Sequence, residues 1–205
     1  MHREECGRID IRKDIPEIEF IDDGGGIFSV DLRLLGGDSS DGILLVNGAK
    51  NENNYALSRA NADGTFTIFN HDNGVNGENY ERDPVAFVYL PADGSTGLIP
   101  ALGRIRDDGS SELSSGEFTI TKIAPGRWAL KIQYHNPSTG TLLISPAGGG
   151  TYNADNTVSY AWNPIAGHWL IESRDLPSSG RQNLNGENAF SFAFITPSPI
   201  YVDQS

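Results

Sequence analysis

The chain has 205 residues with 15 Lys or Arg against 27 Asp or Glu, which gives a formal net charge of −12 at pH 7. An acidic chain without a basic run repels phosphate groups, so we expect neither a nucleic-acid partner nor binding to an anionic membrane surface. No apolar run reaches the length of a membrane span, so we expect no membrane insertion.

The first twenty residues contain no apolar segment of the kind found in a signal peptide. The segment Gly7-Arg8-Ile9 and the residues after it read as the first strand of a module. We therefore expect a leader or a larger region upstream of this chain, and a location outside the cell or on its surface. The single cysteine, Cys6, cannot form a disulfide within one chain and lies in a polar opening.

Apolar and polar residues alternate along several short segments, which is typical of half-buried strands. Phe28, Val30 and Leu32 alternate with polar residues, and Trp128, Leu130 and Ile132 do the same. Further segments of this kind are Phe66 to Ile68, Phe118 to Ile120 and Phe190 to Phe194. The Asp-Gly pairs expected to turn the chain between strands are Asp41-Gly42, Asp63-Gly64, Asp93-Gly94 and Asp108-Gly109.

Eight blocks of sequence recur in the same order, at offsets that drift only from 96 to 109 residues. The matched blocks are Gly7-Arg8-Ile9 with Gly103-Arg104-Ile105, residues 26–32 with 126–132, residues 42–46 with 140–144, residues 53–54 with 155–156, residues 64–68 with 167–171, Asp72 with Asp175, residues 76–79 with 185–188, and Ala86-Phe87 with Ala193-Phe194. This collinearity predicts a tandem duplication.

The fold class predicted from these patterns is all-β, with essentially no helix. We expect two homologous antiparallel β-sandwich modules of about seven strands each, the first over residues 1–97 and the second over residues 98–205. The boundary lies in the turn-rich segment 91–97.

The repeat resembles β-rich tandem repeats near the C-terminal ends of large secreted or surface proteins of planctomycete-like and other environmental bacteria. The residues that carry the resemblance are Gly126-Arg127-Trp128, Thr141-Leu142-Leu143-Ile144, Ser173-Arg174-Asp175-Leu176-Pro177 and Phe190-Ser191-Phe192-Ala193-Phe194-Ile195. The first copy departs from the pattern at residues 69–73. The resemblance implies an extracellular setting and brings no catalytic residues with it.

No motif of catalytic chemistry stands out. The four histidines, at positions 2, 71, 135 and 168, have no metal-ligand spacing, and no G-x-S-x-G elbow or phosphate-binding loop is present. The carboxylate pairs Asp72 with Glu78 and Asp175 with Glu187 could serve a glycosidase, but both pairs recur between the copies, which favours a role in the shared fold. We therefore predict no catalytic residues and no enzyme activity.

The segment from Asp72 to Asp83 is rich in oxygen ligands. It differs from an EF-hand loop, because its third position is Gly, its twelfth is Asp, and no helices flank it. A looser calcium site formed by Asp72, Asn76, Glu78 and Asp83 remains one hypothesis, and a solvated loop held by local turns is the other. No cofactor is required by either interpretation.

The aromatic residues divide into two groups. Trp128 matches Phe28 and Trp169 matches Phe66, so we expect all four in the cores. Tyr160 and Trp162 share one face of a strand and Trp162 has no aromatic counterpart in the first copy, so they are the candidate ligand-binding or partner-binding residues.

The sequence therefore favours a non-catalytic, secreted or surface-displayed structural or adhesive module, in a multimeric or filamentous assembly. The expected partners are further copies of the chain or other surface proteins. The alternative is a carbohydrate-binding module or a phage-type receptor-binding module, with glycans as the ligand. A glycoside hydrolase ranks last.

Overall fold

The structure is a computed structural model, and it describes residues 18–49, 55–71, 81–94, 97–148, 156–175 and 190–197. These residues form fourteen strands and a single turn of 3-10 helix, η1 (Arg33–Leu35). The pairings between these strands are antiparallel, apart from one isolated parallel bridge between Ser58 and Ala147, and the predicted all-β class is confirmed. We call the described residues 18–94 the first half and residues 97–197 the second half.

The first half contains a four-stranded sheet in the order β1-β2-β5-β4 and a two-stranded sheet, β3-β6. The strands are β1 (Glu19–Gly24), β2 (Ile27–Asp31), β3 (Gly42–Gly48), β4 (Tyr55–Ala60), β5 (Phe66–His71) and β6 (Val85–Pro91).

The second half contains two four-stranded sheets, in the orders β12-β13-β10-β9 and β11-β14-β7-β8. The strands are β7 (Ala101–Ile105), β8 (Ser111–Gly116), β9 (Phe118–Ala124), β10 (Arg127–Ile132), β11 (Thr141–Pro146), β12 (Asn156–Asn163), β13 (His168–Asp175) and β14 (Phe190–Ile195).

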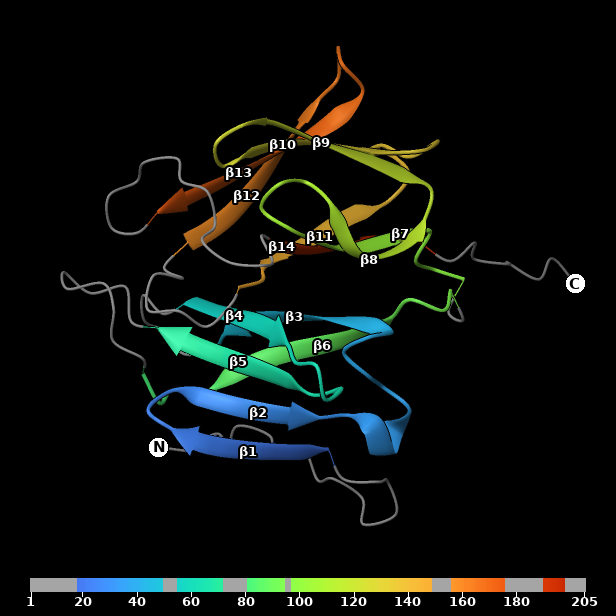
Figure 1. Cartoon of the computed structure of the whole chain (residues 1–205). Coiled ribbons are helices and arrows are strands. Elements are labelled where there is room, and N and C mark those ends of the chain that lie inside the picture. Colours follow the sequence, from blue (N-terminus) through green and yellow to red (C-terminus); the bar gives the residue numbers. More distant parts are fainter. Residues whose placement is uncertain are drawn as a thin grey trace, which may run out of the picture.

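The four sheets are stacked face to face (Figure 1). One apolar core lies between the β1-β2-β5-β4 and β3-β6 sheets, and another lies between the two sheets of the second half. A third cluster lies between the β3-β6 and β11-β14-β7-β8 sheets and joins the halves. β3 and β14 are therefore covered on both faces, whereas Ala86 and Val88 of β6 are exposed.

The predicted alternation accounts for the two outer cores. Phe28 and Val30 on β2 lie opposite Ile68 and Phe66 on β5, and all four side chains are buried. The second half repeats the arrangement: Trp128 and Leu130 on β10 lie opposite Ile171 and Trp169 on β13, and these four side chains are buried too. The prediction that Trp128, Trp169, Phe28 and Phe66 are core residues is confirmed.

The cluster in the middle of the stack does not follow from local alternation. Ile43, Leu45, Leu102 and Ala193 are buried between the halves. Because the neighbouring residues of β3 and β14 face the outer cores, every residue from Ile43 to Val46 and from Phe190 to Phe194 is buried. Removing apolar area from water stabilises by about 25 cal/mol per Å², so this cluster favours contact between the halves.

Strand pairing suggests a different alignment for one block of the sequence match. In the first half, Leu44 lies opposite Tyr89. Leu142 matches Leu44 in sequence and lies opposite Phe194. Under the predicted duplication, Tyr89 would therefore correspond to Phe194, two positions away from the sequence match of Phe87 with Phe194.

Candidate functional site

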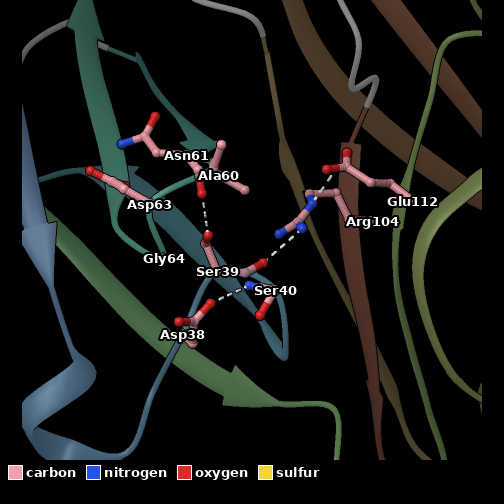
Figure 2. A pocket seen from close by; sticks show the side chains of 10 residues that line it. Asp38, Ser39, Ser40, Ala60, Asn61, Asp63, Gly64, Arg104 and Glu112 are labelled. Carbon is pink, nitrogen blue, oxygen red and sulfur yellow. Dashed lines mark hydrogen bonds and ion pairs between the residues drawn. The ribbon is translucent and has the colours of Figure 1, made fainter.

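A polar hollow of about 440 Å³ lies where the two halves meet (Figure 2). The first half contributes the loop before β3 and the turn between β4 and β5, whereas the second half contributes one side chain each from β7 and β8. The lining residues are Asp38, Ser39, Ser40, Ala60, Asn61, Ala62, Asp63, Gly64, Arg104 and Glu112.

Arg104 is the centre of this site. Its side chain extends from β7 of the second half and is buried, with a residue exposure of 5%. The Nη2 group donates to the carbonyl oxygen of Ser39 at 2.7 Å, and Nη1 donates to the carbonyl oxygen of Gly42 at 3.2 Å. The Nε atom lies 3.4 Å from Oε2 of Glu112. One buried cation therefore binds two backbone carbonyls of the other half.

The electrostatic environment of Arg104 has two opposing parts. Burial lowers the pKa of the Arg104 guanidinium, and the nearby carboxylate of Glu112 raises it. A buried charge is tolerated when hydrogen bonds and an opposite charge replace its hydration, and here the two carbonyls and Glu112 do so. The side chain is thus specialised for joining the halves.

The two aspartates of the hollow stabilise their own loops. Oδ1 of Asp38 accepts from the backbone N–H of Ser40 at 2.7 Å. Oδ1 of Asp63 accepts from the backbone N–H and the hydroxyl of Thr65, at 3.1 and 2.7 Å. Hydrogen bonds from Ser40 and Thr65, respectively, lower the pKa values of Asp38 and Asp63. Both carboxylates are therefore ionised at neutral pH, whereas a glycosidase needs one carboxylic acid with a raised pKa.

The loop and the turn are held to each other. Oγ of Ser39 donates to the carbonyl oxygen of Asn61 at 2.6 Å, and the N–H of Ser39 donates to the carbonyl oxygen of Gly64 at 3.0 Å (Figure 2 shows the first bond). Gly64 has a φ of +90°, and a Cβ at this position would collide with the carboxylate of Asp38. The hollow thus has fixed walls.

The structure places the predicted binding residues, Tyr160 and Trp162, on β12. The hydroxyl of Tyr160 donates to the carbonyl oxygen of Leu142 at 2.7 Å, and 43% of the residue is exposed. Trp162 is half-buried and packs edge-on against Trp169, with ring centroids 4.6 Å apart. Both residues contact their own half, and their role in binding stays a prediction.

Of the predicted calcium ligands, Asp83 is buried beside the start of β6. Asp72, Asn76 and Glu78 lie outside the described residues. Within the part of the chain that the structure describes, no group of three His, Cys, Asp or Glu side chains could hold a metal ion. Calcium binding by the four predicted ligands stays a hypothesis.

Sequence reasoning missed two residues. Arg104 was noted only as part of a repeated block, although its apolar neighbours in β7 could have indicated a buried arginine. Tyr134 has a left-handed backbone, with a φ of 62°, and its side chain is 86% exposed. It follows Gln133, which lines a second hollow of about 400 Å³ together with Glu117 and Lys131. No pattern in the sequence indicates this backbone conformation.

The described residues include no helix that is long and apolar enough to cross a membrane. In comparisons with known proteins, no family model matches the chain, and neither a curated protein nor a solved structure matches it significantly.

Proposed function

We propose that the protein is a non-catalytic structural or adhesive unit, displayed outside the cell and built from a duplicated β-sandwich module. Two features support a contact function over a catalytic one. The polar hollow between the halves uses its charged groups to bind the backbone, and the aspartates there have lowered pKa values. The joined halves also form a stack suited to holding binding surfaces at fixed positions.

The duplication is supported by strand order and by one repeated contact. The order β1-β2-β5-β4 in the first half corresponds to β9-β10-β13-β12 in the second. Ser58 Oγ donates to the carbonyl oxygen of Leu44 at 2.7 Å, and the hydroxyl of Tyr160 donates to that of Leu142 at the same distance. Each bond joins the last strand of an outer sheet, β4 or β12, to a strand of the facing sheet in the same half, β3 or β11.

The contact function rests on the open edge of the outer sheet in the first half. Among the described residues, β1 pairs with β2 alone, and all six of its residues are exposed. Ile21 presents an apolar side chain there with 46% exposure. An edge strand offers unpaired N–H and C=O groups to another chain. We infer that this edge adds a strand from another copy of the chain.

Sedimentation velocity over a wide concentration range tests this function. We expect reversible self-association of the native chain and a loss of association in Ile21→Lys, because a charge on an edge strand opposes strand addition. The control is Ile165→Lys, which places the same charge at a residue that is 98% exposed in the turn between β12 and β13. A native chain that stays monomeric throughout, or equal losses in both variants, would contradict the proposal.

Carbohydrate binding is the second candidate, and Tyr134 is the observation that favours it. A non-glycine residue in the left-handed region costs roughly 1–2 kcal/mol, and such strain is found more often at functional sites. Tyr134, whose ring is exposed, comes directly after Gln133 in the sequence. Gln133 lines a hollow together with Glu117 and Lys131. Aromatic rings stack on sugar faces, and polar side chains bind the hydroxyls.

Tyr134→Gly separates a binding role from a structural role. Glycine adopts a positive φ without a steric cost, so we expect the variant to be at least as stable as the native chain. If the ring binds glycans, the variant loses every signal that the native chain gives on a glycan array. No glycan signal from the native chain, or an unchanged signal from the variant, would reject this second candidate.

A further inference from the structure

The corresponding strands β6 and β14 differ in what lies at their edges. β14 pairs with β11 on one side and with β7 on the other. Among the described residues, β6 pairs with β3 alone. Exposure differs as well: Ala193 of β14 is fully buried, whereas Val88, which corresponds to it, is 44% exposed and lines a hollow together with Leu143. The first half thus has an open edge where the second half has a strand.

The core beside this edge is also open. In the second half, the rings of Phe118 and Phe192 lie 5.0 Å apart, and a Cβ on Gly103 of β7 would meet them at 3.0 and 2.9 Å. β7 therefore needs a glycine where it crosses these rings. In the first half, the rings of Phe20 and Phe87 are stacked with centroids 6.2 Å apart, and Phe20 is 42% exposed. A pair of rings is present there, without a described strand across it.

The sequence contains the matching segment. Gly7-Arg8-Ile9 repeats Gly103-Arg104-Ile105, and in the second half these three residues lie on β7 opposite Phe192, Ser191 and Phe190. We propose that the open edge of β6 is a docking site for residues 6–9 of the same chain, which add to it as an antiparallel strand.

The pairing of β7 with β14 fixes the register of this added strand. Gly7 lies opposite Phe87, so that its missing side chain leaves room for the rings. Cys6 lies opposite Val88, because the equivalent residues Leu102 and Ala193 are paired in the second half. This inference rests on the duplication proposed above and is independent of the proposed self-association through β1.

The geometry favours the same chain over a second copy. The chain enters β1 next to β6, since Phe20 of β1 stacks on Phe87 of β6. The nine Cα-to-Cα steps from Ile9 to Ile18 can span about 30 Å when extended. A segment of the same chain also avoids the entropy cost of association, so it binds the edge in preference to a segment of another molecule. The docked segment then protects β6 from pairing with other chains.

Disulfide trapping tests both the docking and its register. In Val88→Cys, the introduced thiol faces Cys6 across the strand pair, within the Cα separation of about 4.4–6.8 Å that a disulfide needs. We expect an intramolecular disulfide under mild oxidation, seen as a monomer on a non-reducing gel and located by peptide mapping. Ala86→Cys is the matched control, because it is exposed on the same strand but diagonal to Cys6, at about 7–8 Å. Adding Cys6→Ser abolishes the disulfide.

The alternative outcomes are distinct. Equal trapping in Val88→Cys and Ala86→Cys, or no trapping in either, would overturn the proposal. Disulfide-linked dimers of Val88→Cys would overturn it in favour of a second copy at this edge. None of these outcomes alters the sedimentation test with Ile21→Lys, so failure here is distinguishable from failure of the proposed function.

Hydrogen exchange of the full chain gives a measurement that needs no new cysteine. Gly7→Val places a branched side chain against the rings of Phe20 and Phe87, so we expect faster exchange in β6 and unchanged exchange in β14. Protection of β6 that is the same in both proteins would contradict the docking.

Discussion

The two halves share a sheet geometry but differ in how completely they close their cores. Trp128 and Trp169 of the second half are enclosed by a four-stranded sheet, and both are almost fully buried. Phe28 lies under a sheet with two described strands, retains 6% exposure, and stacks on Phe20, which is 42% exposed. The difference teaches that the core is closed at this side by strands such as β7 and β8, for which the described part of the first half has no counterpart.

The largest expected effect is a difference between equivalent aromatic residues. Trp128→Ala removes a fully buried side chain and should lower the free energy of unfolding by about 3–5 kcal/mol. Phe28→Ala should cost clearly less, because the cavity lies next to exposed Phe20 and can fill with water or collapse. Urea denaturation of both variants measures the gap, and equal costs would mean that the first core is as closed as the second.

The joint between the halves gives the next largest effect. Arg104→Met leaves the carbonyl groups of Ser39 and Gly42 without their donor and Glu112 without its cation, which should cost roughly 2–4 kcal/mol. Calorimetry should show the single unfolding transition of the native chain split into two.

Arg127→Met is the control for the joint. Arg127 lies 3.1 Å from Glu172 within the second half and is partly exposed, so its loss should cost under about 1 kcal/mol and leave one transition. A single transition in Arg104→Met would show that the other contacts, among them the apolar cluster and the hydrogen bonds between Ser145 and Val46, are enough to couple the halves.

Acid should destabilise the first half at a pH where the second half is unaffected. Burial lowers the pKa of His71 to about 4, and its ring stacks on Tyr55 with centroids 5.1 Å apart. The unfolded chain takes up a proton near the ordinary pKa of 6.5 whereas the folded chain resists it, so stability falls as the pH drops from about 6.5 to about 4. The loss is at most about 1.4 kcal/mol per pH unit.

Arg174 takes the place of His71 on β13 and is exposed. Urea denaturation between pH 7 and 4.5 should therefore show a steeper decline for the native chain than for His71→Gln. Parallel curves would show that His71 does not take part in the acid response.

The smallest expected effect concerns the repeated hydrogen bond. Ser58→Ala and Tyr160→Phe each remove one donor to a strand carbonyl, worth about 1 kcal/mol. Ser58 is buried and Tyr160 is 43% exposed, so water can replace only the second donor and Ser58→Ala should cost more. Thermal unfolding of the two variants decides the order, and a larger cost for Tyr160→Phe would contradict it.

Local sequence patterns predicted the features that depend on a single strand and its adjoining turn, namely which face is buried and where the chain turns. The alternation at Phe28 and Trp128 identified core faces, because period two is a property of the strand itself. The same rule treats Ser191 and Ala193 as facing solvent, yet both are buried, because a second sheet covers β14. Burial by a distant sheet leaves no periodic signal in the covered strand.

The candidate site shows the same limit. Asp63-Gly64 was predicted as a turn and is one, since its conformation is determined by adjacent residues. The partners of Arg104 are more than sixty residues away in sequence, at Ser39 and Gly42. Only the three-dimensional arrangement of the halves brings that cation to those carbonyls.

The apolar cluster between the halves has a consequence for synthesis of the chain. Ile43 and Leu45 are covered by Leu102 and Ala193, and Ala193 is made about 150 residues after Ile43. At about 5–20 residues per second, these side chains emerge from the ribosome roughly 7–30 s before their cover is complete. During that interval the first half exposes the apolar face of a sheet. Slower translation between residues 97 and 193 should therefore increase the aggregation of nascent chains and their binding by chaperones.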